Sequence, residues 1–260
     1  MEQLKNKSIV ICGALRNNEK YMETVFKNIY AITSFFQSYK IILYENDSND
    51  NTINILKSYM DKDTNLICCF ENNVDNTYKY RTERLSYIRN KLLNHALEKC
   101  NNYDYLLNMD MDDVNSTTDI VDTFHHIFDY NENIWDIQSI NQRVKYYDIW
   151  AYRKKGLIEH DCWFEVKRDL YNKIPYEISY EKNIGRFDKP FKMSKGLIPV
   201  ISAFGGAAIY KMSKLKEGND IKYNGMCQYG EICEHVYFHQ MLKNKYNAKI
   251  FINPMWINKD

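Results

Sequence analysis

Three aspartates follow an apolar, aromatic run in the middle of the chain. The run begins at Tyr103, and Asp110, Asp112 and Asp113 stand at its end. Such a run is typical of a buried strand in an α/β sheet, and ligands of open α/β sheets bind beyond the carboxyl ends of the strands. Because side chains alternate along a strand, Asp110 and Asp112 are expected to point the same way. Two carboxylates and the oxygens of a diphosphate suit a hard cation, so the spacing predicts a Mn²⁺ or Mg²⁺ site; the alternative is a solvated acidic turn.

A second acidic group follows an earlier predicted strand, residues 40–44. Glu45 and Asp47 stand at its exit. A carboxylate at that position can accept hydrogen bonds from a ribose or a base. A calcium loop is disfavoured, because Thr52 and Ser58 stand where such a loop needs a glycine and a distal glutamate. The remaining alternative is a polar turn that caps the next helix.

Cationic residues precede the aspartates on a predicted helix, residues 82–99. Arg81 and Arg84 lie near its start, and Arg89 is followed by Asn90. Guanidinium groups bind phosphates through paired hydrogen bonds, so this helix could neutralise a leaving diphosphate. The alternative is an ordinary solvated helix face.

The last polar cluster combines a carboxylate with two imidazoles. Glu231, then Glu234 or His235, and then His239 fall on one helical side at spacings of three and four. A carboxylate there could act as a general base and an imidazole as a metal ligand. A zinc-protease site is disfavoured, because no Glu follows His235. Inert surface residues are the alternative.

Two adjacent glycines, Gly205 and Gly206, interrupt a late apolar stretch. Without a Cβ, their backbone can approach a ligand or a neighbouring strand closely. The chain contains no glycine-rich dinucleotide loop and no Gly-Lys-Ser/Thr phosphate loop. Dinucleotide oxidoreductases and P-loop enzymes are therefore disfavoured.

Composition excludes several classes of protein. The 260 residues are 45% hydrophobic and 27% charged, and 35 Lys and Arg against 34 Asp and Glu leave a formal charge of +1. This balance gives no general electrostatic reason to bind nucleic acid or a membrane surface. The seven cysteines form no Cys-x-x-Cys pair, and neither a signal peptide nor a run of membrane-spanning length is visible. We expect a reduced, soluble, cytoplasmic protein.

Hydrophobic periodicity predicts strands alternating with helices in the first half of the chain. Strands are predicted at 8–15, 40–44, 65–70 and 103–109, and helices at 19–36, 53–60 and 82–99. This alternation predicts an α/β fold with a mostly parallel sheet and right-handed crossovers. The second half is less regular: a helix is predicted at 120–129, a strand at 134–146, a glycine-containing apolar stretch at 197–210, a helix at 233–243 and a strand at 249–252. We expect one domain over 1–260, with a nucleotide-binding half at 1–114 and an acceptor-binding half at 115–260.

Taken in order, the motifs resemble those of GT-A fold glycosyltransferases. Five of them resemble motifs of family-2-like transferases: Tyr44-Glu-Asn-Asp-Ser-Asn-Asp-Asn-Thr, Arg89-Asn, Asn108-Met-Asp-Met-Asp-Asp-Val, Gly205-Gly and Cys233-Glu-His. A further motif, Tyr147-Asp-Ile-Trp-Ala-Tyr-Arg, is similar to one of fungal capsule-type mannosyltransferases. The resemblance implies a single GT-A (Rossmann-like) domain, a mostly parallel mixed sheet flanked by helices. It also implies a metal-dependent hexosyltransferase that moves a sugar from a UDP- or GDP-sugar to a glycan or glycoprotein acceptor.

The resemblance also assigns roles to individual residues. Glu45 and Asp47 would hold the nucleoside, and Arg84, Arg89, Asn90 and Asp110 would face the rest of the donor. Asp110 and Asp112, assisted by Asp113 and His239, would hold Mn²⁺ or Mg²⁺. Tyr147, Asp148, Trp150, Gly205 and Gly206 would contact the acceptor or the sugar. Glu234 or His235 would be the base: many inverting relatives carry Glu-Asp here, so His235 leaves both the base and the stereochemical outcome open.

Two other classes of protein stay possible on these residues. A sugar-phosphate nucleotidyltransferase shares a related sheet and also needs a metal, but its glycine-rich signature near the amino terminus is missing around Gly13. A catalytically inactive glycan-binding or scaffold module on the same fold is disfavoured by the intact carboxylates at Asp110, Asp112 and Glu234.

Overall fold

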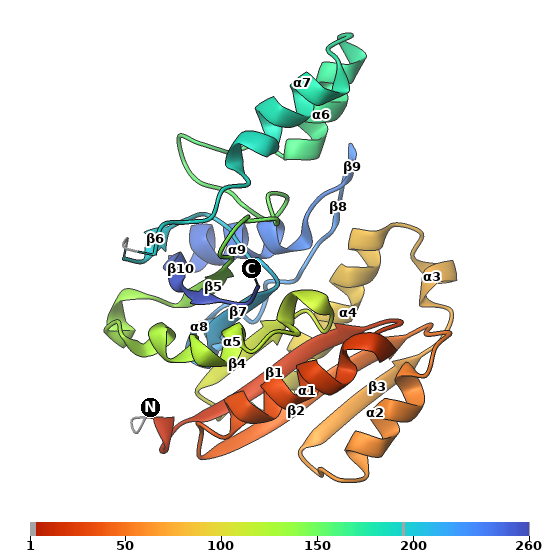
Figure 1. Ribbon diagram of the computed structural model, residues 1–260, viewed down its shortest axis with the longest axis vertical. Coiled ribbons are helices and arrows are strands. Elements are labelled where there is room, and N and C mark those ends of the chain that lie inside the picture. The colour runs from red at the N-terminus through yellow and green to blue at the C-terminus, as the bar shows by residue number, and fades with distance from the viewer. Residues whose placement is uncertain (1–3, 194–195, 260) are drawn as a thin grey trace.

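An eight-stranded sheet runs through the molecule, with strand order β3-β2-β1-β4-β7-β5-β10-β6 (Figure 1). The structure is a computed structural model that describes residues 4–193 and 196–259. The strands are β1 (Ser8–Leu15), β2 (Ser38–Asn46), β3 (Leu66–Glu71), β4 (Tyr105–Met109), β5 (Ile137–Asn141), β6 (Ile198–Pro199), β7 (Ala207–Lys211) and β10 (Ile250–Ile257). All except β6 and β7 run in one direction, so the predicted α/β fold with a mostly parallel, mixed sheet is confirmed.

Helical crossovers connect the first four strands. The helices are α1 (Glu19–Thr33), α2 (Thr52–Met60), the short α3 (Val74–Thr77) and α4 (Arg81–Lys99). β1 pairs in parallel with β2 and β4, and β2 pairs in parallel with β3. The carboxyl ends of these strands therefore meet at one edge of the sheet, where ligands of such folds bind.

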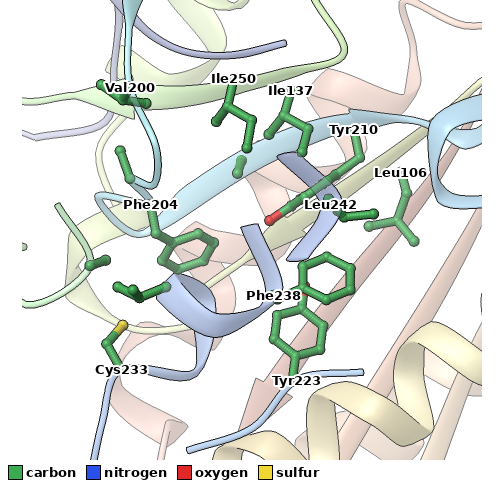
Figure 2. Close-up of a cluster of buried hydrophobic side chains, with 14 of the residues drawn as sticks. Leu106, Ile137, Val200, Phe204, Tyr210, Tyr223, Cys233, Phe238, Leu242 and Ile250 are labelled. Carbon is green, nitrogen blue, oxygen red and sulfur yellow. The ribbon is translucent and has the colours of Figure 1, made fainter. Parts of the chain in front are cut away.

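Side-chain alternation divides the core into two layers. Ile9 and Ile11 of β1 pack with the apolar side of α1, whereas Val10 and Cys12 pack with α4 and α9 (Glu234–Tyr246). Figure 1 shows α1 and α2 in front of β1, β2 and β3. Figure 2 shows part of the second layer, in which α9 packs on β7 through Phe238 and Leu242. Burial of each such side chain stabilises the fold by about 1.5–3 kcal/mol.

The second half of the chain differs from its predictions in two places. The helix predicted at 120–129 is divided into α5 (Asp119–Asp122) and a 3₁₀ turn, η3 (Phe124–Phe128). The division falls at Thr123, whose Oγ1 accepts a hydrogen bond from the Ile257 amide of β10. The strand predicted at 134–146 is confined to β5.

A helical hairpin, α6 (Cys162–Tyr171) and α7 (Tyr176–Asn183), extends away from the sheet and was not predicted (Figure 1). The buried residues of α7 are Ser179 and Asn183, and both side chains bond to Asp169 of α6. Because α7 is held through polar groups, it carries no apolar stripe that periodicity could detect.

The remaining elements are small. They are α8 (Met212–Glu217), the two-stranded ribbon β8 (Met226–Cys227) and β9 (Gly230–Glu231), and the 3₁₀ turns η2 (Asp113–Asn115), η4 (Glu132–Ile134) and η5 (Gly185–Phe187). The seven cysteines are free thiols. Over residues 4–193 and 196–259, every helix is too short or too polar to cross a membrane.

Candidate functional site

A cavity of about 480 Å³ lies at the carboxyl ends of β1, β2 and β4. The strand exits contribute Arg16, Asn18, Asn46 and Asp110, and α4 contributes the arginines of its first half. Its other lining residues are Ala14, Leu15, Asn17, Tyr21, Arg81, Arg84, Leu85, Ile88, Arg89, Met111, Asp112 and Asp113. The structure thus brings the predicted metal-binding aspartates and the predicted cationic helix to one cavity.

The aspartate turn is fixed mainly through its backbone. The Asp110 amide donates to Gly206 O (2.8 Å), and Asn115 Nδ2 donates to both Asp110 O (2.7 Å) and Gly206 O (2.8 Å). Asp112 precedes η2 and accepts a hydrogen bond from the Val114 amide through Oδ1 (3.2 Å). Within residues 4–193 and 196–259, Oδ2 of Asp110 and Oδ2 of Asp112 make no hydrogen bond.

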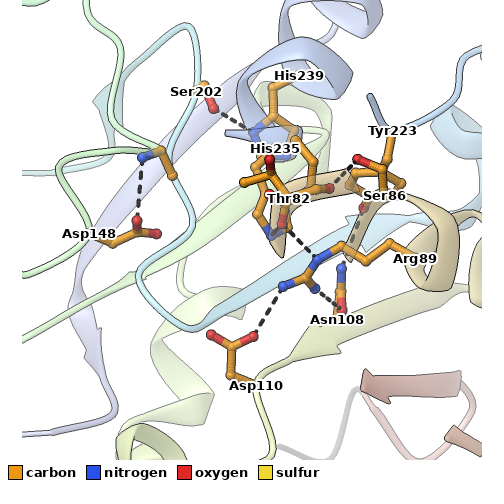
Figure 3. A network of polar contacts seen from close by, with 12 residues as sticks. Thr82, Ser86, Arg89, Asn108, Asp110, Asp148, Ser202, Tyr223, His235 and His239 are labelled. Atoms are coloured by element: carbon orange, nitrogen blue, oxygen red, sulfur yellow. Dashed lines mark hydrogen bonds and ion pairs between the residues drawn. The ribbon is translucent and has the colours of Figure 1, made fainter. Parts of the chain in front are cut away.

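Arg89 is the hub of a buried polar network (Figure 3). Its Nε donates to Glu234 Oε1 (2.9 Å), Nη1 to Asn108 Oδ1 (3.1 Å) and Nη2 to Asp110 Oδ1 (3.2 Å). Only 4% of Arg89 is exposed. Burial alone would lower the pKa of its guanidinium, but the carboxylates of Glu234 and Asp110 outweigh burial and raise it. Arg89 is therefore a fixed cation between two carboxylates.

Carboxylates outnumber cations at the aspartate turn. Burial raises the pKa of Asp110 to about 7; Arg89 opposes this rise, and repulsion from Asp112 and Asp148 adds to it. Burial also raises the pKa of Asp112. Asp113 is ion-paired with Lys259. A cation placed between Asp110 and Asp112 would relieve this repulsion.

A second cavity, of about 210 Å³, adjoins the first. Arg81, Leu85, Arg89 and Asp110 line both. The other lining residues are Tyr147, Asp148, Trp150, Phe204, Cys233, Glu234 and His235. The structure therefore brings together the predicted base and most of the predicted acceptor residues.

Backbone contacts hold the residues of this smaller cavity. Asp148 accepts hydrogen bonds from the amides of Ala151 (3.3 Å) and Gly205 (2.9 Å). Burial raises the pKa of Asp148, and these two hydrogen bonds oppose the rise. Trp150 is held by a hydrogen bond from Nε1 to Asp161 (2.8 Å), whereas Tyr147 remains half exposed.

The two glycines pack against protein backbone and side chains. Gly205 and Gly206 have φ values of 68° and 91°, in the left-handed region. A Cβ on Gly205 would lie 2.7 Å from Ile140 O, and a Cβ on Gly206 would lie 2.7 Å from Val114 Cγ1. Tight packing therefore accounts for both glycines, and their contribution to the site is to hold Asp110 and Asp148.

The two histidines of α9 are buried and neutral. His239 shares hydrogen bonds with Ser202 through Nδ1 (3.1 Å) and with Tyr210 through Nε2 (2.8 Å). The prediction of His239 as a metal ligand is therefore corrected, because both ring nitrogens are occupied and the residue lines neither cavity. His235 stacks on Phe204 with ring centroids 3.8 Å apart, and burial lowers its pKa well below the ordinary value.

Three residues predicted to contact the donor are not among the lining residues of the larger cavity. The Asn90 amide exchanges two hydrogen bonds with the Tyr223 backbone, so its predicted role at the diphosphate is corrected. Glu45 is buried and accepts from the Ser48 amide (2.9 Å). Asp47 accepts from the amides of Asn73 and Asp75. Their neighbour Asn46 lines the cavity instead.

Arg84 lies in the lining, as predicted, but its guanidinium is also occupied by protein. It donates to the carbonyls of Tyr78 (2.9 Å) and Lys79 (3.1 Å) and pairs with Asp75 (3.3 Å). Arg81 lines both cavities. Of the two, Arg81 is the less constrained cation.

Sequence reasoning missed the exit of β1 as part of the site. Arg16, Asn17 and Asn18 line the larger cavity, and none of them is among the predicted site residues. Asn18 Nδ2 donates to Met111 O (2.9 Å), which ties the exit of β1 to the aspartate turn. The available signal was their position at the carboxyl end of a predicted parallel strand.

A metal ion would need ligands from a bound substrate. Among the residues that the structure describes, no group of three or more His, Cys, Asp and Glu side chains is arranged to hold a metal. Asp110 and Asp112 still fit a hard cation, because each keeps an oxygen free of hydrogen bonds beside the same cavity. Mg²⁺ and similar ions are commonly held by one or two carboxylates together with substrate phosphates.

Comparison with known proteins identifies a family for most of this chain. Residues 8–217 match the family model described as Glycosyl transferase family 2. The sequence matches none of the curated proteins. The S. aureus TarS 1–349 crystal structure is similar to this chain with a TM-score of 0.51 at 19% identity, over 95% of this chain and 57% of that chain.

Two further solved structures have the same fold. One is the mannosyltransferase PcManGT from Pyrobaculum calidifontis in complex with GDP-Man and Mn²⁺, with a TM-score of 0.54 at 12% identity, over 98% of this chain and 57% of that chain. The other is S. aureus TarS 1–349 with UDP-GlcNAc, with a TM-score of 0.51 at 18% identity, over 95% and 55%. This chain spans little more than half the length of these structures. The likeness confirms the GT-A fold, and because the family model covers more than half of the sequence, the chain belongs to glycosyl transferase family 2.

Proposed function

We propose that the chain is a metal-dependent hexosyltransferase that moves a sugar from a UDP- or GDP-sugar to a hydroxyl group of a glycan or glycoprotein. Membership of glycosyl transferase family 2 supports the reaction class. The complexes of TarS with UDP-GlcNAc and of PcManGT with GDP-Man and Mn²⁺ support the donor class and the metal. The observation that carries the proposal is the wall common to both cavities, where Arg89 joins Asp110 to Glu234.

The larger cavity is the proposed donor site. Its lining lies within residues 14–113, which supports a donor-binding half at 1–114 within a single domain over 1–260. Asn46 and the exit of β1 face the nucleoside, and Arg81 and Arg84 face the diphosphate. Glu45 and Asp47 act indirectly, by fixing the loops behind Asn46.

The aspartate turn is the proposed metal site. Asp110 and Asp112 would hold Mn²⁺ or Mg²⁺, and Asp113 stays paired with Lys259 beside them. When bound, the ion offsets negative charge on the departing nucleoside diphosphate. Arg89 keeps Asp110 in place through Nη2 and adds positive charge on the same side of the cavity.

The smaller cavity is the proposed acceptor site, with Tyr147 and Trp150 as surfaces for a sugar ring. Glu234 accepts the proton of the acceptor hydroxyl. At the same time the hydroxyl oxygen bonds to the anomeric carbon of the donor sugar, and the bond between that carbon and the diphosphate breaks. Both oxygens of Asp148 accept backbone hydrogen bonds, whereas Glu234 uses Oε1 for Arg89 and keeps Oε2 free of hydrogen bonds to the described residues. His235 forms the neutral wall behind Glu234. This single displacement inverts the anomeric configuration.

A thermal-shift panel tests the proposal. UDP, GDP, CMP and dTDP sugars are each added with and without Mn²⁺, because a ligand that binds only the folded state stabilises it by about 2.7 kcal/mol at one hundred times its dissociation constant. We expect one nucleotide family to raise the melting temperature only when Mn²⁺ is present. If no donor does so, a catalytically inactive module on this fold becomes the better account.

Replacement of the base separates donor binding from chemistry. Glu234→Gln keeps an oxygen that can accept from Arg89, so we expect normal donor binding and a loss of transfer of about 10²-fold or more. The measurements are the thermal shift with donor and Mn²⁺ and the rate of nucleotide release with acceptor. Undiminished turnover would show that another group is the base or that the reaction retains configuration.

A further inference from the structure

A third cavity lies outside the donor and acceptor sites and has a volume of about 1,090 Å³. We call it the basic cavity. Its lining residues are Tyr152, Lys154, Gly156, Leu157, Arg186, Phe187, Lys189, Pro190, Phe191, Lys192, Gly196, Leu197, Ile198 and Pro199. It shares no residue with the two cavities described above.

The charges of this lining have one sign. Lys154, Arg186, Lys189 and Lys192 contribute positive charge, and the lining contains no Asp or Glu. Within residues 4–193 and 196–259, none of these four side chains takes part in an ion pair or a side-chain hydrogen bond. The nearby Asp188 does not compensate them, because it pairs with Lys145 (2.6 Å). A concave surface lined by cations of one sign attracts anions.

Aromatic side chains complete the wall of the basic cavity. The Arg186 guanidinium lies 4.4 Å from the centroid of the Phe187 ring. Tyr152 and Phe191 pack edge to face with ring centroids 5.5 Å apart. Tyr152 is 2% exposed, and its hydroxyl has no hydrogen-bond partner among the described residues. Because buried polar groups are normally hydrogen-bonded, this hydroxyl is an unsatisfied polar group in a residue that lines the cavity.

The basic cavity and the acceptor site lie at two ends of the same pair of segments. Arg153 and Ser202 form an antiparallel bridge between residues 150–154 and residues 198–204. The acceptor site includes Trp150 and Phe204, and the basic cavity includes Lys154 and Ile198, at the other end of each segment. Four residue steps span at most about 14 Å, so one extended molecule can reach both places.

We propose that the basic cavity binds a phosphate group carried by the acceptor, and that the enzyme therefore acts on a phosphate-containing glycan. The proposal rests on the proposed function. Guanidinium and ammonium groups together suit the several oxygens of a phosphate, and the aromatic wall suits the adjoining sugar ring. The cations line a concavity at the far end of the two segments that carry Trp150 and Phe204 of the acceptor site, which favours a chain-like acceptor over the flat surface of a membrane.

Binding of short-chain polyphosphate tests the charge recognition directly. The variant Lys189→Gln/Lys192→Gln removes two exposed cations of the cavity without touching the donor site. The control Lys57→Gln/Lys62→Gln makes the same change of charge at two exposed lysines on and beside α2. By titration calorimetry at constant salt, we expect the cavity variant to bind polyphosphate at least about tenfold more weakly than wild type, and the control to change by less than about twofold.

Three results would overturn the proposal. The first is that the wild type does not bind polyphosphate, and the second is that both double variants bind polyphosphate equally weakly. The third is that the cavity variant loses binding to phosphatidylserine vesicles but keeps its binding to polyphosphate. The donor panel is independent, since no residue of the basic cavity lines the donor site. Polyphosphate binding without any donor-dependent shift would therefore reject the proposed transferase and leave the anion site intact.

A transfer assay then identifies the source of the phosphate. With the donor found in the panel, a phosphorylated oligosaccharide and its dephosphorylated form are compared as acceptors. We expect Lys189→Gln/Lys192→Gln to raise KM about tenfold for the phosphorylated acceptor and to leave KM for the dephosphorylated one and kcat for both unchanged. An equal change of KM for both acceptors would contradict phosphate recognition.

Discussion

At the scale of single residues, Arg89 determines the charge balance of the site. It is buried and contacts two carboxylates from different elements, Asp110 after β4 and Glu234 at the start of α9. A buried charge is tolerated when it is paired, and removal of one partner leaves the others uncompensated. The same side chain therefore supports the fold and positions the proposed base relative to the metal site.

Replacement of Arg89 by methionine should destabilise the protein strongly. Glu234 and Asp110 would lose their common cation, and we expect the free energy of unfolding to fall by about 3–5 kcal/mol. Urea denaturation at pH 7 measures this loss. Arg84→Met is the matched control, because Arg84 is a partly exposed arginine of the same helix, and we expect a loss of about 1 kcal/mol. Equal losses in the two variants would mean that the buried network is not special.

Asp112→Asn should separate metal binding from folding. The asparagine Oδ1 can still accept from the Val114 amide, while the negative charge is removed from the aspartate turn. We expect the Mn²⁺-dependent shift with donor to disappear and the melting temperature without metal to stay the same or rise, since repulsion with Asp110 is relieved. Asp122→Asn, an exposed site on α5, should leave both quantities unchanged. Full Mn²⁺-dependent binding by Asp112→Asn would remove the metal proposal.

At the scale of elements, the site depends on how closely β7 approaches the aspartate turn. Gly206, next to the first residue of β7, accepts from the Asp110 amide and has a positive φ of 91°. Backbone conformation and packing therefore both require glycine at this position. The glycine-containing apolar stretch predicted at 197–210 therefore includes the residue that holds the aspartate turn in place.

Gly206→Ala should damage both stability and donor binding. The positive φ costs about 1–3 kcal/mol for a residue with a Cβ, and the contact 2.7 Å from Val114 Cγ1 adds to this cost and displaces the turn. Gly156→Ala is the control, because Gly156 has a similar φ of 73° and open space around its Cβ position. Denaturation and donor thermal shifts should show a larger stability loss at Gly206 and a loss of donor binding there alone. Equal losses of stability in Gly206→Ala and Gly156→Ala would mean that the positive φ alone accounts for the loss.

At the scale of the whole molecule, acid should act through the buried histidines of α9. Burial lowers the pKa of His239 to about 3, and the positive charge of Arg89 lowers it further. In the unfolded chain a histidine titrates at about 6.5. The stability that His239 contributes is therefore complete above pH 6.5 and is lost as the pH falls from 6.5 toward 3, by up to about 1.4 kcal/mol per pH unit.

A comparison of variants is needed to isolate the contribution of His239, because Asp110 changes the unfolding free energy with pH in the opposite direction. Its pKa is raised to about 7 when folded, so it favours the folded state at acid pH. We expect the unfolding free energy of His239→Gln to depend less steeply on pH between 6.5 and 4.5 than that of wild type, by about 1 kcal/mol per unit. His160→Gln, at an exposed histidine, should keep the wild-type slope. If the unfolding free energies of wild type and His239→Gln changed in parallel with pH, the conclusion that His239 is buried in its neutral form would be contradicted.

Sequence patterns alone were enough to predict the first half of the fold and the place of the site. β1, α2 and α4 lie within a residue or two of their predicted bounds, because each buries one regular stripe of side chains on the sheet. The order of strands and helices then brought Asp110 and Asp112 to the same edge as Asn46, since parallel strands end together.

Which of the predicted residues reach that edge depends on packing that the sequence patterns do not reveal. His239 and Asn90 have suitable chemistry and spacing, but their hydrogen bonds are satisfied by Tyr210, Ser202 and Tyr223, which are distant in sequence. Helix α7 packs on α6 through polar side chains, and the basic cavity is lined by residues of separate segments, so neither leaves a periodic pattern in the sequence. Local spacing fixes which way a side chain leaves its own strand or helix, whereas its partners are set by packing between segments far apart in the chain.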